Sequence, residues 1–132
     1  MTGIVVPGPF TKLAMAVWPF IFLPPGMYSR YARGEATIDD QAVMLHERTH
    51  IAREWAMNPL VFGVRYLRDK KFRLREELAA IREEMQFRRA HGSVYDIERK
   101  ARHFSSALYG YLLPYEDAVR VLTELWTERY TA

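Results

Sequence analysis

The chain has 132 residues and a mass of 15.5 kDa, a length that fits one compact core and is short for two independent domains. Hydrophobic residues make up 49% and charged residues 27%, which excludes a disordered tail, a collagen-like fibre and a polytopic membrane protein. Cysteine is absent, which excludes a disulfide scaffold, a Cys-ligated zinc ribbon, an iron–sulfur cluster and a thiol nucleophile. A metal site must draw its ligands from sixteen carboxylates and four histidines: His46, His50, His91 and His103.

The net charge is +3, and arginine outnumbers lysine by 15 to 4. Residues 65–102 carry twelve basic and seven acidic groups and are the block best suited to a polyanion. The signs alternate along this block, however, as is typical of a solvated helix with ion pairs four residues apart. This alternation argues against nucleic acid as a partner.

Residues 1–36 are expected to be extended. Most of their apolar residues are strand formers: Val5, Val6, Val17, Trp18, Phe20, Ile21, Phe22, Tyr28 and Tyr31. Pro24-Pro25-Gly26 indicates a turn, so we expect one short hairpin or a pair of strands. The apolar run Leu13 to Leu23 is too short for the ~20 residues of a spanning helix, and we expect neither a membrane span nor a signal peptide.

From Thr37 onward the pattern predicts helices. Asp39 or Asp40 can cap a helix over about 39–57, which Asn58-Pro59 ends. Pro59 begins a second helix that runs to about Arg68. A long helix over about 72–90 follows, and Gly92 marks its end. Its predicted buried stripe consists of Leu74, Leu78, Ile81 and Met85, with Phe87 as a further candidate.

Two more helices complete the predicted fold. Ser93 with Asp96 resembles a capping box for a helix over about 94–108. Pro114 begins the last helix, whose inward residues are expected to be Val119, Leu122, Leu125 and Trp126. The predicted class is α+β, mainly α: a single domain over 1–132, with a short β element (1–36) before a helical part (37–132).

Residues 46–50 read His-Glu-Arg-Thr-His, the pattern on which a metal-site hypothesis rests. Side chains four residues apart stand one turn above each other on a helix, so the two imidazoles can converge on one zinc. Glu47 is rotated by about 100° from His46 and can reach a water bound to that metal. From the composition, about 0.01 accidental matches are expected in this chain. The pattern therefore predicts a zinc-hydrolase site.

A helical wheel separates the two histidines from the main apolar stripe. At about 100° per residue, His46 and His50 lie within about 40° of each other, on a face that also carries Glu47 and Glu54. The apolar stripe lies elsewhere on the wheel and consists of Met44, Leu45, Ile51, Ala52 and Trp55. A catalytic zinc needs a third protein ligand besides a water. His91, His103 and any carboxylate on a neighbouring helix are candidates.

A helix with His-Glu-x-x-His, followed after an intervening helix by one with Glu-x-x-Ala, resembles the gluzincin branch of the zincin metallopeptidases. In particular, it resembles small phage and bacterial zincin-like proteins that have little beyond the two metal-binding helices, here about 39–57 and 72–90. The matching residues are 46–50 and, 27 residues after His50, Glu77-Leu78-Ala79-Ala80. The resemblance implies that Zn²⁺ is the cofactor, that Glu77 is the third ligand, and that the small Ala80 lets the helices approach.

Glu76 is the alternative third ligand, because Glu76 with Ala79 also fits the pattern Glu-x-x-Ala. On the wheel Glu77 shares a face with the predicted buried stripe, whereas Glu76 lies beside Arg73 toward the polar side. We therefore favour Glu77.

The resemblance implies zinc-dependent hydrolysis of a peptide bond. Zinc lowers the pKa of its bound water toward ~7, and Glu47 passes a proton from this water to the leaving amine. The candidate donors that could stabilise the oxyanion are Tyr109, Tyr111 and His103. Such an aromatic run is, however, more typical of core packing.

The expected substrate is a peptide or protein, and a protein partner or a second copy of the chain can complete the cleft. Two alternatives remain. In one, the same site binds zinc only to staple two helices of a catalytically inactive structural or interaction protein. In the other, the chain is an arginine-rich nucleic-acid binder in which the motif is accidental. We expect a cytoplasmic location, or a place in the virion if the chain is phage-encoded.

Overall fold

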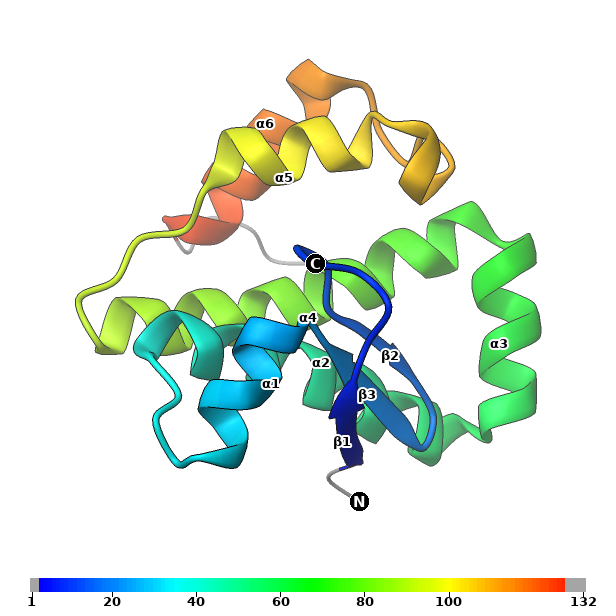
Figure 1. The fold of residues 1–132 in the computed structure, drawn as a ribbon. Coiled ribbons are helices and arrows are strands. Elements are labelled where there is room, and N and C mark those ends of the chain that lie inside the picture. The colour runs from blue at the N-terminus through cyan, green and yellow to red at the C-terminus, as the bar shows by residue number, and fades with distance from the viewer. Residues whose placement is uncertain (1–2, 128–132) are drawn as a thin grey trace. The chain divides into compact units, whose positions relative to one another are not determined.

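A small three-stranded sheet begins the chain in the computed structural model, which describes residues 3–127 (Figure 1). The strands are β1 (Ile4–Pro7), β2 (Met15–Val17) and β3 (Phe20–Leu23), in the order β1-β3-β2. β1 runs parallel to β3 with Val5 opposite Ile21, and β2 runs antiparallel to it with Ala16 opposite the same residue. The predicted β element is thus confirmed, with three strands in place of two.

The prediction that residues 1–36 are extended is wrong for residues 25–32. Pro25–Ala32 form helix α1, because Pro25 at the first helical position has the backbone angle that a helix needs and sacrifices no hydrogen bond there. Tyr28 packs against the apolar core of the sheet. The residues Tyr28 and Tyr31, predicted as strand formers, therefore lie on a helix.

Helix α2 (Ile38–Met57) carries the His-Glu-x-x-His motif. The Thr37 hydroxyl accepts the backbone N–H of Asp40, and the Asp40 carboxylate accepts the N–H of Thr37, both at 3.0 Å. The cap is therefore Thr37, and the predicted Asp39 or Asp40 cap is wrong. Asn58 ends α2 as predicted, and its side chain caps helix α3 (Pro59–Arg68).

Helix α4 (Lys70–Ala90) begins two residues before the predicted position, because Asp69 caps it by accepting the N–H of Phe72. Leu78, Ile81 and Met85 are buried as predicted, whereas Leu74 is half-buried. Three carboxylates of α4 are buried as well: Glu76, Glu77 and Glu84. The alternating charges of this helix, typical of a solvated surface, thus include carboxylates that the fold buries. α2 and α4 lie side by side (Figure 1).

The sheet packs on α2 through an apolar cluster. Ile21 and Leu23 of β3 meet Met44 and Ile51 of α2, and all four side chains are buried. The Trp18 ring stacks on Trp55 with centroids 5.4 Å apart. These contacts place one side of α2 against the sheet and leave the histidine side to α4.

The described residues divide into two compact units, one up to residue 93 and one from residue 94 onward, so the expectation of a single domain stays a prediction. The second unit contains α5 (Ile97–Phe104), a 3₁₀ turn (Ala107–Tyr109) and α6 (Tyr115–Trp126). The helix predicted over about 94–108 is confirmed but is shorter than predicted, because Asp96 caps α5 and the helix ends before Ser105. Leu122 and Leu125 of α6 are buried as predicted, and Val119 and Trp126 are half-buried.

The structure confirms the α+β, mainly α class, with six α-helices among the described residues. Within residues 3–127, no helix has both the length and the apolar character required to cross a bilayer.

Asp40 is the residue through which α1 and α2 are joined. Its carboxylate accepts two hydrogen bonds from the Arg30 guanidinium, at 2.6 and 2.8 Å, in addition to the capping contact with Thr37. The hydrogen bonds from Arg30 hold the pKa of Asp40 below its ordinary value; burial opposes this, and the N–H of Thr37 adds to it.

We expect Asp40→Asn to lower the free energy of unfolding by about 1–3 kcal/mol near neutral pH, because the charge-assisted bonds to Arg30 are lost. A carboxyl whose pKa is lower in the folded than in the unfolded state stabilises above about pH 4, and that contribution is lost as the pH falls through the lowered pKa. Urea unfolding at several pH values measures both effects. The exposed Glu83→Gln is the control, and equal stability of the two variants at neutral pH would contradict the prediction.

Candidate metal centre

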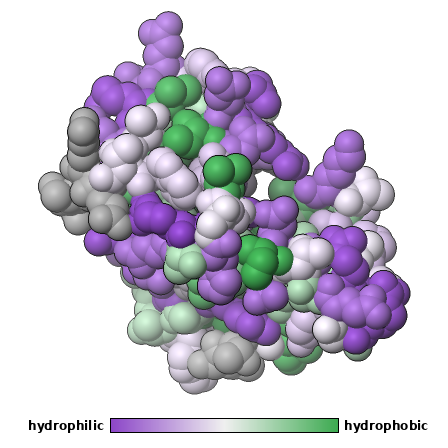
Figure 2. Space-filling view, turned by 90° about the vertical axis from the view of Figure 1, so that its left-hand side faces the viewer, coloured by the Kyte–Doolittle hydropathy of each residue, from purple (hydrophilic) through white to green (hydrophobic). Residues whose placement is uncertain are grey.

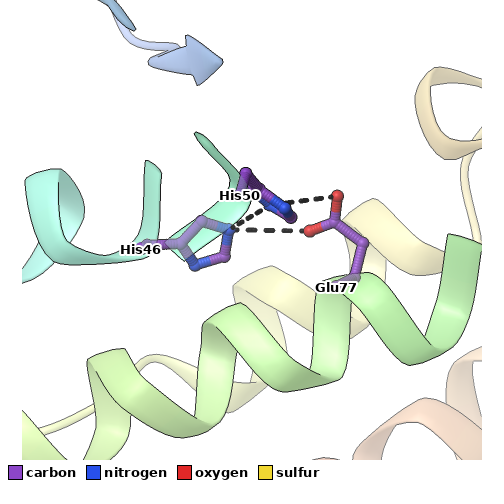
Figure 3. A group of neighbouring side chains, drawn as sticks. All are labelled: His46, His50 and Glu77. Atoms are coloured by element: carbon purple, nitrogen blue, oxygen red, sulfur yellow. Dashed lines mark hydrogen bonds and ion pairs between the residues drawn. The ribbon is translucent and has the colours of Figure 1, made fainter. Parts of the chain in front are cut away.

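Two imidazoles of α2 and one carboxylate of α4 point toward one another between these helices (Figure 3). The Nε2 atoms of His46 and His50 are 3.2 Å apart. Glu77 Oε2 lies 3.5 Å from His46 Nε2, and Glu77 Oε1 lies 3.4 Å from His50 Nε2. All three residues are buried, with 5%, 8% and 4% of their surfaces exposed.

The separation of the two nitrogens suits a shared metal ion. Ligand atoms at 2.0–2.1 Å from a tetrahedral zinc lie about 3.3 Å from one another. The two Nε2 atoms are 3.2 Å apart, and each of them lies 3.4 or 3.5 Å from a different oxygen of Glu77. With one ligand atom from each residue, the three atoms lie within 4.8 Å of one another, so the group can hold a metal ion.

The protonation of the group also favours a cation at its centre. Burial alone opposes ionisation of Glu77, but the charge of His50 and the contacts from His46 and His50 outweigh it and hold the pKa of Glu77 well below its ordinary value. Two imidazole lone pairs that face each other at 3.2 Å repel unless a proton or a metal ion lies between them. A negative carboxylate and two nitrogens thus surround a position suited to positive charge.

A second carboxylate of α4 fixes the orientation of His46. Glu84 Oε1 lies 3.0 Å from His46 Nδ1, and Glu84 Oε2 accepts the Nε–H of Arg88 at 2.9 Å. Burial raises the pKa of Glu84, but His46 and Arg88 together hold it below its ordinary value. An ionised Glu84 accepts the Nδ1–H of His46, which leaves the Nε2 lone pair toward the centre of the group.

Tyr66 of α3 contacts the carboxylate of Glu77. Its hydroxyl donates to Glu77 Oε1 at 2.6 Å. Glu77 Oε2 is buried and has no hydrogen-bond partner among the described residues. A buried carboxylate oxygen without a donor is costly in an apolar setting, and a metal ion at the centre would satisfy it.

Glu47 is buried, with 7% of its surface exposed, and follows His46 directly on α2. Glu54, two turns further on, is half-buried. Burial raises the pKa of Glu54 to about 7; His50 and the N–H of Trp18 oppose the rise, and Glu47 and Glu76 add to it. The neighbourhood of the histidines therefore contains a carboxyl that exchanges its proton near neutral pH.

The structure brings His46, His50 and Glu77 together and leaves the other candidate ligands outside the group. The carboxylate of Glu76 instead pairs with Arg53, whose Nη2 donates to Glu76 Oε1 at 3.0 Å. The prediction that Glu76 lies toward the polar side is wrong, because this pairing buries it. His91 is exposed and 14 residues beyond Glu77 on the same helical axis, about 21 Å away.

His103, Tyr109 and Tyr111, the predicted oxyanion donors, all belong to the second compact unit. The His103 and Tyr109 rings stack with centroids 6.1 Å apart. The expectation that one of these three residues serves the site stays a prediction.

Sequence reasoning missed two residues of the site, Glu84 and Tyr66. Glu84 lies seven residues after Glu77 and thus on the same helix face, a spacing that was visible in the sequence. For Tyr66 no sequence signal exists, because its contact with Glu77 depends on how α3 packs on α4.

Comparison of the chain with protein-family models, with curated proteins and with solved structures finds no match. The resemblance to gluzincins stays a prediction, and the functional argument rests on the geometry of the site.

We expect Glu84→Gln to weaken the binding of a divalent metal by about 10- to 100-fold, because the amide no longer holds His46 as the carboxylate does. Titration with Zn²⁺ and with Co²⁺, whose visible spectrum reports tetrahedral coordination, measures this affinity. The adjacent Glu83→Gln removes the same charge at an exposed position and serves as the matched control. Equal affinities of the two variants would show that Glu84 does not support the site.

Proposed function

We propose that the chain is a zinc-dependent hydrolase of peptide bonds, with His46, His50 and Glu77 as metal ligands and Glu47 as general base. The observation that carries the proposal is the buried group of two imidazoles and a carboxylate whose ligand atoms lie within 4.8 Å of one another. Two histidines and a glutamate form a ligand set that catalytic zinc sites use, and three protein ligands leave the fourth position for water or substrate.

Each residue of the site has a distinct part in the proposed reaction. Bound zinc supplies a Lewis acid that lowers the pKa of water and polarises a carbonyl group. Glu47 takes a proton from the attacking water and delivers it to the leaving amine. Glu84 keeps the Nε2 of His46 available, and Tyr66 holds the carboxylate of Glu77 in place. The low exposure of the site keeps the charges that act there poorly screened by solvent.

A structural zinc site is the second candidate function, and the same burial favours it. The three ligands and Glu47 are almost fully covered, as expected for a metal that staples α2 to α4. In that role the chain needs no substrate access, and Glu47 has no proton to transfer. The two functions share their ligands and differ in what Glu47 does.

Metal analysis of protein purified without added metal tests the site itself. We expect near-stoichiometric zinc in the parent chain and its loss in both His46→Ala and Glu77→Ala, because each removes one of three ligands. His91→Ala, which removes an exposed histidine outside the group, is the matched control. Full zinc retention by Glu77→Ala would remove Glu77 from the ligand set.

Glu47→Gln distinguishes the hydrolase from the staple. We expect this variant to keep its zinc and to cleave a mixed peptide library at least about 100-fold more slowly than the parent, because the amide cannot accept the proton. Mass spectrometry of the cleavage products gives the rate. Zinc-loaded parent and variant that both leave every peptide intact would reject the hydrolase and favour the staple.

A further inference from the structure

The outer face of α3 exposes a stripe of large aliphatic side chains. Leu60 and Leu67 are 78% and 79% exposed, and Val61 and Val64 are each 48% exposed. At about 100° per residue, Leu60, Val64 and Leu67 lie within about 60° of one another, with Val61 at the margin. Such a continuous stripe on a helix is an expected contact surface. Figure 2 shows the left-hand side of the view in Figure 1. On that face, hydrophobic residues appear as separate spots among hydrophilic ones.

The stripe is not needed for the interior of the protein. Phe62 and Tyr66 already form the inner face of α3: the Phe62 ring packs edge-on against Phe72 at 5.3 Å, and Tyr66 reaches Glu77. α3 is thus anchored by one face, and its aliphatic face is held toward solvent.

Positive charge is concentrated in the sequence at the end of α3 and the start of α4. Residues 65–75 contain six basic side chains and one acidic side chain, Asp69, which is 4.0 Å from Arg65. The basic residues are Arg65, Arg68, Lys70, Lys71, Arg73 and Arg75. Arg68, Lys70 and Lys71 are exposed. An aliphatic stripe flanked by exposed lysine and arginine is the composition of helices that lie in the interface of an anionic membrane.

We propose that the outer face of α3, together with the basic residues that follow it, docks on a membrane surface that carries anionic phospholipids. The leucines enter the boundary between headgroups and acyl chains, and the basic residues contact the headgroup phosphates and carboxylates. This contact is peripheral and requires no spanning segment. The proposal goes beyond the hydrolase and does not depend on the metal site.

The charge and the stripe together favour a lipid surface over other occupants. A nucleic acid would use the basic residues but would leave the aliphatic stripe in water. A second copy of the chain would cover the stripe but would bring two groups of six basic side chains together. An anionic bilayer satisfies both features at once.

The test is sedimentation of the full chain with vesicles of phosphatidylcholine, with or without phosphatidylserine. We expect binding to the vesicles that contain phosphatidylserine, and we expect added salt to weaken it. Leu67→Gln should lower the partition coefficient about tenfold, because a leucine no longer leaves water. Arg68→Gln combined with Lys71→Gln should lower it by about tenfold or more.

Matched controls lie in the second compact unit. Val94→Gln replaces an aliphatic side chain with 77% of its surface exposed, and Arg99→Gln combined with Arg102→Gln removes two exposed positive charges. These controls should bind vesicles within about twofold of the parent. Circular dichroism of each variant verifies that its helices are intact.

Equal binding by Leu67→Gln and Val94→Gln, or no binding of the parent to vesicles, would overturn the proposal. So would parent protein that binds duplex DNA but not vesicles, which would assign the basic residues to nucleic acid. A dimer in size-exclusion chromatography that Leu67→Gln dissociates, without any vesicle binding, would assign the stripe to a second copy.

Discussion

The convergence of two imidazoles and one carboxylate between α2 and α4 is the constraint on which the rest of the first unit depends. Burying an ionised carboxylate is costly unless positive charge and hydrogen bonds surround it. Here Glu77 meets His46 and His50 on one side and the hydroxyl of Tyr66 on the other. The oxygen of Glu77 that faces His46 has no hydrogen-bond donor among the described residues, and a cation at the centre of the group would satisfy it.

This group is part of the packing between α2 and α4. Each of the three buried carboxylates of α4 has its partner on α2: Glu76 with Arg53, Glu77 with His46 and His50, and Glu84 with His46. An interface of aliphatic side chains tolerates a shift of one turn better than an interface of matched charges, because a shift separates every pair and leaves charges buried alone. We therefore infer that the pairs which orient the metal ligands also fix the register of the two helices.

The elements predicted correctly are those whose signals are local. Asn58 and Pro59 end α2 and begin α3 where the sequence analysis placed the boundary, because a proline restricts its own neighbours whatever the fold. α1 was missed because its tyrosines favour strands in general, whereas here a proline at its start and the packing of Tyr28 on the sheet favour a helix. Local propensity is weak where packing decides.

The same division explains how much of the site the sequence could predict. His46 and His50 are on one helix at a spacing of one turn, so their proximity follows from helix geometry alone. The approach of Glu77 depends on how α4 packs on α2, and its choice over Glu76 rested on a helical wheel. That wheel placed Glu76 toward solvent, and the placement failed because Arg53, 23 residues earlier in the chain, provides an ion-pair partner for the buried carboxylate. A wheel assigns a charged residue to the outside by its type, but a carboxylate whose charge is paired across two helices is tolerated inside. The polar residues of a buried site are therefore the ones that hydrophobic patterning misplaces, and they are recognised only when the partner helix is known.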